Sequence, residues 1–217
     1  MLRKAVLFGL LLLPAFGSVR APFEEATVVV AVQAFLDETS ETEILKIWRD
    51  APAALELDAA FARGAVPHIT FGSWEIPRSR LDSVRKRFRK RKREFETVGA
   101  SLTLDRWGPY RGKYGFAYLV NETPVLLALH ETVHRKLNLV YRPYRPQDLP
   151  GQWEPHLALF TIPEAAREEH AELLRRVAGR CENIRSVSIT RFGLVAFDDG
   201  VQLLEVIPCK KSTMRKR

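Results

Sequence analysis

The chain has 217 residues, 46% of them hydrophobic and 28% charged, which is typical of a soluble globular protein. This composition excludes collagen-like, coiled-coil and disulfide-scaffold classes. The net charge of +8 comes from two short segments, residues 85–93 with eight cations and a basic tail at residues 210–217 with five. Such segments suit a polyanionic partner or a targeting receptor, and many are only solvated surfaces. The two cysteines, Cys181 and Cys209, could pair in an oxidising compartment but do not indicate a disulfide framework.

Residues 1–21 have the pattern of a secretory signal peptide. Arg3 and Lys4 precede an apolar stretch, and Val19-Arg20-Ala21 has small or apolar residues at the positions that a signal peptidase reads, with cleavage expected after Ala21. Cleavage there would direct the protein to the secretory pathway or outside the cell, whereas without cleavage a cytoplasmic or nuclear location is expected. The leader is too short to span a bilayer comfortably, so we expect no stable membrane span.

Strand and helix patterns alternate from residue 27 onward. Strands are expected where β-branched and apolar residues dominate, and helices where apolar residues recur on one stripe. In chain order the expected elements are a strand at 27–36, a helix opened by a capping box at 40–43, a strand at 66–76, a helix at 80–95, strands at 101–106 and 115–120, a helix at 124–139, a loop at 141–151, a strand at 155–162, a helix at 163–177 and a hairpin of 187–197 with 201–207.

A degenerate repeat divides this order into two halves. A module of Pro-His, strand, proline and helix occurs at residues 67–95 and again at residues 155–177. The repeat predicts an α+β fold with two related lobes, each contributing one strand to a shared cleft. We expect residues 22–209 to form this single bilobal domain and the protein to be a monomer.

Two histidines occupy matching positions in the repeat. Pro67-His68-Ile69-Thr70 begins one expected strand, and Pro155-His156-Leu157-Ala158 begins the other. Because side chains alternate along a strand, His68 and Thr70 should point to one face while Ile69 points to the core. Each strand is therefore expected to present one histidine to a common side.

Two facing histidines can cleave a phosphodiester bond without a metal ion. A neutral imidazole takes a proton from water or a ribose hydroxyl, and an imidazolium protonates the leaving oxygen, because the imidazole pKa lies near neutrality. Thr70 would donate a hydrogen bond to a non-bridging phosphoryl oxygen. We therefore expect His68 and His156 to be catalytic, Thr70 to bind substrate, and no cofactor to be needed; which histidine is the base stays open.

These motifs and the order of elements resemble the two-histidine phosphoesterase superfamily, the relatives of 2′-5′ RNA ligase and cyclic phosphodiesterase enzymes. The resemblance spans residues 27–207, and residues 67–74 are the closer match. It implies an α+β, bilobal fold in which two antiparallel sheets flank a central cleft with helices outside. It also implies a hydrolase that acts on RNA or a nucleotide with a ribose phosphodiester, such as a 2′,3′-cyclic phosphate or a 2′-5′ linkage.

Ala158 departs from the pattern of that superfamily, which has threonine or serine two residues after each histidine. Thr161 cannot simply replace the missing hydroxyl, because three residues along a strand it points to the opposite face. Either a different donor serves, or the protein is a catalytically weakened member that binds RNA or a nucleotide.

A second histidine pattern, His130-Glu131-Thr132-Val133-His134, has the spacing of a zinc metallopeptidase motif. On a helix the two histidines would share a face and hold zinc while Glu131 activates water. The third ligand of the extended motif is missing, since Leu137 and Val140 stand where glycine and histidine are required. A zinc peptidase is therefore the less favoured alternative, and we expect no metal site.

Aromatic and basic residues flank the two histidine motifs. Trp74 follows the first motif, and Tyr144 precedes the second among arginines. Bases that stack on aromatic rings while arginine contacts phosphates are typical of single-stranded nucleotide recognition. Trp74 and Tyr144 are therefore candidate substrate contacts, and the cations of residues 85–93 could extend binding along an RNA backbone.

Overall fold

The computed structural model describes residues 25–51, 56–57, 66–96, 101–110, 115–137, 142–198 and 200–210. The predicted leader and all of the basic tail except Lys210 lie outside the described residues. The strands are β1 (Thr27–Leu36), β2 (Glu56–Leu57), β3 (His68–Pro77), β4 (Ser101–Pro109), β5 (Gly115–Val120), β6 (Arg142–Pro143), β7 (His156–Thr161), β8 (Ser186–Phe197) and β9 (Val201–Pro208). The helices are α1 (Glu38–Asp50), α3 (Leu81–Lys90), α4 (Lys92–Glu96), α5 (Pro124–Leu137) and α6 (His170–Cys181), with 3₁₀ turns η1 (Arg78–Arg80), η2 (Pro146–Asp148) and η3 (Glu164–Glu169).

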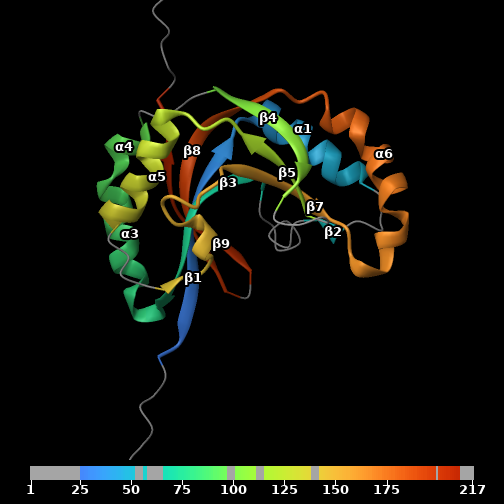
Figure 1. Ribbon diagram of the computed structural model, residues 1–217. Coiled ribbons are helices and arrows are strands. Elements are labelled where there is room, and N and C mark those ends of the chain that lie inside the picture. Colours follow the sequence, from blue (N-terminus) through green and yellow to red (C-terminus); the bar gives the residue numbers. More distant parts are fainter. Residues whose placement is uncertain are drawn as a thin grey trace, which may run out of the picture.

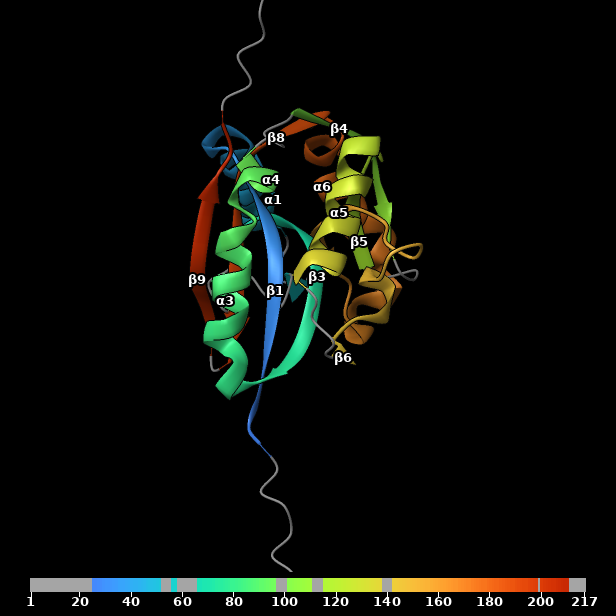
Figure 2. The same cartoon turned by 90° about the vertical axis from the view of Figure 1, so that its left-hand side faces the viewer.

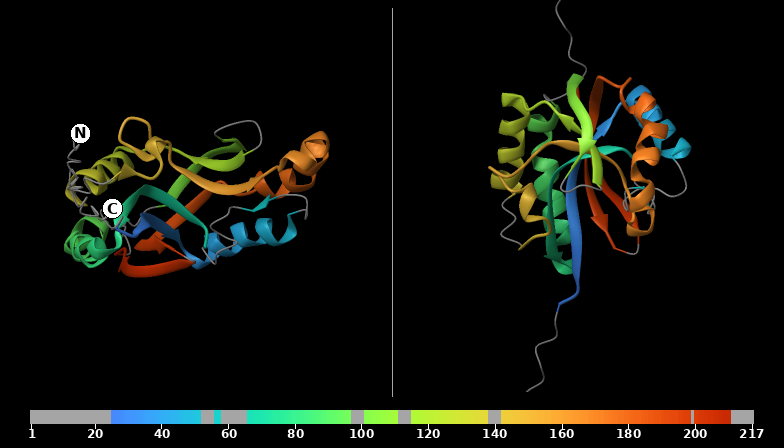
Figure 3. Two further views of the ribbon diagram at one scale, coloured as in Figure 1. Left: turned by 90° about the horizontal axis from the view of Figure 1, so that it is seen from below. Right: turned by 45° about the vertical axis from the view of Figure 1, so that its right-hand side comes forward.

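The strands form two antiparallel arrays, in the orders β9-β8-β1-β3-β6 and β4-β5-β7-β2. The arrays are joined at two places: β4 pairs with β8, and Ile69 of β3 pairs with Leu157 of β7. Helices α3, α4 and α5 lie at one end of the molecule and α1 and α6 at the other (Figures 1 and 2). The view from below shows the same division of the helices into two groups around the strands (Figure 3). The predicted α+β fold with two antiparallel sheets and outer helices is confirmed.

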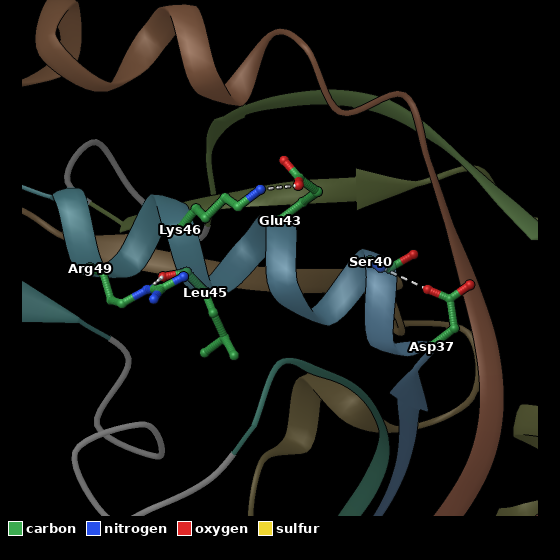
Figure 4. Close-up of polar contacts among 6 residues, drawn as sticks. All are labelled: Asp37, Ser40, Glu43, Leu45, Lys46 and Arg49. Atoms are coloured by element: carbon green, nitrogen blue, oxygen red, sulfur yellow. Dashed lines mark hydrogen bonds and ion pairs between the residues drawn. The ribbon is translucent and has the colours of Figure 1, made fainter.

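Helix α1 begins earlier than its sequence pattern predicts. The side chain of Asp37 caps it by accepting a hydrogen bond from the backbone N–H of Ser40 at 2.7 Å (Figure 4). The hydroxyl of Ser40, which was expected to cap, instead accepts a hydrogen bond from the backbone N–H of Ser188 on β8 at 3.2 Å. Both aspartate and serine are good capping residues, so a tertiary contact decided between them.

The expected helix at 80–95 is divided into α3 and α4 at Arg91. Its apolar stripe is nevertheless continuous, because Val84, Phe88 and Phe95 are all buried. The rings of Phe88 and Phe95 are 4.9 Å apart, within the range of favourable aromatic pairs. The cations of the segment therefore lie away from the core, as the helix pattern predicted.

The described helices carry no span suited to a membrane: none is long and apolar enough to cross one. Cys181 is buried and Cys209 half-buried, and both are free thiols. Burial raises the pKa of each thiol to about 11, so neither forms the reactive thiolate near neutral pH.

Candidate active site

The alternation of β3 places His68 and Thr70 together on one face of the sheet. Both side chains are partly exposed, whereas Ile69 and Phe71 between and after them are buried. On the other lobe, His156 and Ala158 lie on one face and fully buried Leu157 on the other; Ala158 is partly exposed, whereas His156 is buried. We call the side of the sheet that carries these two histidines the histidine face.

The opposite side of the sheet packs against the helices. Tyr118, the Cα partner of Leu157, donates its hydroxyl to the backbone carbonyl of Cys181 at the end of α6, at 2.8 Å. Phe192 of β8 packs against Phe95 of α4 with ring centroids 5.0 Å apart. The helices therefore support the strands from behind and leave the histidine face to form the site.

The single antiparallel pair between β3 and β7 brings the two motifs together. Since Ile69 is opposite Leu157, Thr70 lies opposite His156, and His68 lies opposite Ala158. Diagonal neighbours in such a pair are about 7–8 Å apart. His68 and His156 therefore face each other at a separation that can hold a phosphoryl group between two imidazoles.

The two imidazoles are oriented by the same hydrogen bond. His68 Nδ1 lies 2.8 Å from the carbonyl oxygen of Val66, and His156 Nδ1 lies 3.0 Å from the carbonyl oxygen of Glu154. A carbonyl only accepts, so Nδ1 carries the proton in both rings. The lone pair of each neutral ring is then on Nε2, and each ring can act as a base at Nε2 or, once protonated there, as an acid.

Aromatic rings border both histidines. Tyr110 at the end of β4 stacks on His156 with ring centroids 4.0 Å apart and 25° between the planes. Its backbone N–H donates to the carbonyl of Gly115 at 2.7 Å, and a Cβ at Gly115 would lie 2.8 Å from the Tyr110 carbonyl oxygen. Glycine at 115 therefore permits the close approach of Tyr110, whose ring stacks on His156. On the first lobe, the ring of Phe35 lies edge-on to His68 at 6.5 Å.

Polar groups are distributed unequally between the lobes. Gln33, the Cα partner of Thr70, is 2% exposed, and its Oε1 has no hydrogen-bond partner in the described part of the chain. At the corresponding positions of the second lobe, Ala158 pairs with Ala117. The histidine face thus offers a hydroxyl and an amide on the His68 lobe and methyl groups on the other.

The structure puts the ring of Trp74, a predicted substrate contact, on the side of β3 opposite the histidine face. Between Val32 and Gln33 the pairing of β1 with β3 shifts by one residue, because Gly72 pairs with Val32 whereas Thr70 pairs with Gln33. This bulge reverses the alternation, so Trp74 lies on the buried side at 3% exposure and packs against His134 of α5.

Tyr144, the other predicted contact, is 55% exposed and follows β6. Its backbone N–H donates to the carbonyl of Ser73 at 2.9 Å. Ser73 is five residues along β3 from His68, which is about 17 Å at 3.4 Å per residue. Tyr144 is therefore not brought beside the two histidines.

The His130-Glu131-x-x-His134 motif lies on α5, as predicted, but its histidines serve the fold. His130 Nε2 donates to the carbonyl of Asp148 at 2.8 Å, and His134 Nε2 donates to the carbonyl of Phe71 at 3.1 Å. Both Nε2 atoms are thus used to hold backbone carbonyls, and only Nδ1 of each neutral ring keeps a lone pair. Glu131 is exposed, and no cluster of three possible metal ligands occurs among the described residues.

Burial controls the protonation of this histidine pair. It lowers the pKa of His130 to about 4, with a further reduction from the neighbouring His134. Burial also lowers the pKa of His134, and the hydrogen bonds of both rings oppose the effect. Both rings are therefore neutral near pH 7, when they donate to the carbonyls that they contact.

Trp153 connects the histidine pair of α5 to the backbone of β3 beside Thr70. No sequence pattern predicted this connection. Its ring stacks on His130 with centroids 4.1 Å apart and 5° between the planes. Its Nε1 donates to the carbonyl of Thr70 at 3.0 Å. Trp153 and His134 thus hold consecutive carbonyls of β3, those of Thr70 and Phe71.

Comparison with known proteins supports the fold. No protein-family model matches the sequence, and no curated protein does. Among solved structures, E. coli LigT in complex with 3′-AMP is 16% identical with a TM-score of 0.54 and covers 86% of this chain and 100% of its own. A phosphoesterase is 15% identical, with a TM-score of 0.54 and the same coverage. TT0787 of Thermus thermophilus is 14% identical, with a TM-score of 0.54, and covers 85% of this chain and 99% of its own. The chain therefore shares the fold of these solved structures, and the expected α+β fold is confirmed.

Proposed function

We propose that the protein is a metal-independent phosphodiesterase that acts on RNA ends or cyclic nucleotides, at a 2′,3′-cyclic phosphate or a 2′-5′ linkage. The observation that carries the proposal is the matched pair of imidazoles, each with its proton on Nδ1 and its lone pair on Nε2, on facing strands. The shared fold with LigT, whose structure was solved with 3′-AMP, supports a nucleotide as the substrate.

The chemistry follows from these two rings. With a 2′,3′-cyclic phosphate, the neutral histidine takes a proton from water while the water oxygen bonds to phosphorus. The bond from phosphorus to one ribose oxygen breaks, and the protonated histidine gives its proton to that oxygen. The product is a phosphomonoester beside a free hydroxyl, and the two histidines have exchanged protonation states.

In this proposal Thr70 stabilises the negative charge that develops on the non-bridging phosphoryl oxygens. It lies opposite His156 and two residues from His68, so its hydroxyl faces the space between the two rings. A hydrogen bond to a non-bridging oxygen there strengthens as negative charge accumulates. The histidines and Thr70 together supply base, acid and oxyanion donor.

A second candidate function is supported by the alanines of the second lobe. Ala158 and its partner Ala117 offer no hydroxyl where the superfamily pattern has a second one. Loss of one such donor costs on the order of 10²–10³-fold in rate. In this second candidate function, the histidine face chiefly binds RNA or a nucleotide.

The test is hydrolysis of a 2′,3′-cyclic nucleotide by the full chain in excess EDTA, beside His68→Ala and His156→Ala. We expect turnover by the unmodified protein and its loss in both variants. Val125→Ala is the matched control, because Val125 is 57% exposed on α5. Turnover that EDTA abolishes would overturn the metal-free mechanism, and nucleotide binding without turnover would favour the second candidate.

A further inference from the structure

A row of three side chains crosses the first lobe on the histidine face. On β1, Phe35 is the Cα partner of His68 on β3 and also of Arg191 on β8. Paired residues of antiparallel strands point to the same face, so the three side chains project together. The Cζ of Arg191 lies 5.4 Å from the centroid of the Phe35 ring, which in turn lies 6.5 Å from the His68 ring.

The second lobe has a row of the same kind. On β5, Leu119 is the Cα partner of His156 on β7 and of Arg106 on β4. The sequence of side chains across the strands is again histidine, apolar residue, arginine. The side chain of Arg106 is 71% exposed and that of Arg191 is 42% exposed, so both are accessible to a ligand.

An approximate two-fold axis relates the rows. It passes through the antiparallel contact of Ile69 with Leu157, which places the histidines near the axis and the arginines at the outer ends. Each arginine lies two strands from its histidine, about 10 Å between Cα atoms at the usual strand spacing. The space between the histidines is thus flanked by one cation on each side.

We propose that Arg191 and Arg106 bind the phosphates on either side of the scissile phosphodiester, so that an oligonucleotide is cleaved with a higher kcat/KM than a cyclic mononucleotide. The inference rests on the proposed function, whose site it extends. A guanidinium binds phosphate through two parallel N–H groups. Arg191 also contacts Glu41 of α1 at 3.5 Å, but five N–H donors leave it capacity for a phosphate.

A nucleoside polyphosphate is the other source of closely spaced phosphates. Its phosphates follow one another on a single side of the nucleoside, so it would engage one of the two arginines. An oligonucleotide that runs across the histidine pair engages both. A nucleoside polyphosphate should therefore lose affinity when one of the two arginines is replaced, whereas an oligonucleotide should lose affinity when either is replaced.

The experiment compares two substrates: a 2′,3′-cyclic mononucleotide and a 2′-5′-linked dinucleotide that carries a phosphate at both ends. The variants are Arg191→Gln and Arg106→Gln. The control is Arg135→Gln, on the exposed surface of α5. Hydrogen bonds to charged groups contribute about 1.5–3 kcal/mol. Arg191→Gln and Arg106→Gln should therefore each lose roughly 10- to 100-fold in kcat/KM on the dinucleotide. The mononucleotide should be cleaved at the unmodified rate.

A structural role of Arg191 is tested by Glu41→Gln, which breaks the ion pair and keeps the cation. We expect Glu41→Gln to leave dinucleotide cleavage unchanged and Arg191→Lys to restore part of it. Three results would overturn the inference while the proposed function stood. They are an equal loss of kcat/KM on both substrates, a loss in only one of the two arginine variants, and a loss in Glu41→Gln as large as that in Arg191→Gln.

If the unmodified protein cleaves neither substrate, the proposed function fails, and binding decides the role of the arginines. The probe is then a single-stranded RNA oligonucleotide, and the measurement is its affinity as a function of salt. Each phosphate contact contributes about 0.7 to the salt slope for single strands. The slope in question is that of the logarithm of the affinity against the logarithm of the salt concentration. If Arg191→Gln and Arg106→Gln each lower it by about that amount, the inference is supported, and an unchanged slope overturns it.

Discussion

The phenol ring of Tyr110 stacks on the imidazole of His156, with centroids 4.0 Å apart. Because His156 is only 7% exposed, this ring helps to fix the orientation of its Nε2. Aromatic pairs contribute about 0.5–1.5 kcal/mol. We therefore predict that Tyr110→Ala lowers kcat by roughly 2- to 10-fold, whereas Tyr110→Phe, which keeps the ring, retains activity. Steady-state kinetics on a 2′,3′-cyclic nucleotide measure the effect, and equal rates in both variants would contradict it.

Ala158 lies opposite His68 on the histidine face, where a hydroxyl would meet the bound phosphoryl group. We predict that Ala158→Thr raises kcat by about 10-fold or more with little change in affinity, because an oxyanion donor acts mainly in the transition state. Ala158→Val, which has nearly the same shape without the hydroxyl, is the control. Unchanged or lower turnover for the threonine variant would show that another group already fills this role.

The main elements could be predicted from the sequence because their patterns are local. The strand at 27–36 is a run of β-branched and apolar residues, and β1 has those bounds. The division of α3 from α4 at Arg91 and the cap at Asp37 could not be predicted. At the start of α1, Ser40 is engaged by Ser188 of the distant strand β8, so that Asp37 is left to cap the helix.

The site shows the same limit. His68 and His156 could be found because each belongs to a short motif in a strand. Tyr110, Phe35 and the two arginines reach the histidines through pairing between distant strands, and register of that kind leaves no local signal. Trp74 was proposed as a substrate contact because it follows the first histidine motif, and the sequence does not reveal the bulge that puts its ring on the buried side of β3.

The buried pair of His130 and His134 predicts loss of stability in acid. Burial lowers the pKa of His130 to about 4 in the folded protein, against about 6.5 in the unfolded chain. Below pH 6.5 the unfolded chain therefore binds protons that the folded protein does not, and stability falls as the pH falls toward 4. His130 alone should lower the free energy of unfolding by about 2 kcal/mol between pH 7 and pH 5.

Urea unfolding at the two pH values measures this change. His130→Gln removes the titrating group, so the free energy of unfolding of this variant should depend less on pH. At pH 7 the variant should be less stable than the unmodified protein, because the hydrogen bond to Asp148 is altered. An identical pH dependence in the variant would show that other groups cause the effect.

Gly193 on β8 provides the most direct test of the first row, because its missing side chain makes room for Phe35. A Cβ there would collide with the Phe35 ring and lie 2.9 Å from Leu203 Cδ1. Overpacking of this kind costs about 1–3 kcal/mol. We predict that Gly193→Ala lowers the free energy of unfolding by that amount. Because Phe35 lies between His68 and Arg191, the variant should also lose more activity on the doubly phosphorylated dinucleotide than on the mononucleotide. Gly108→Ala is the matched control: it lies two residues from Arg106, and no described atom lies within 4 Å of its added Cβ. If both variants lost stability and activity equally, the ring of Phe35 would not be what couples the histidine to the arginine.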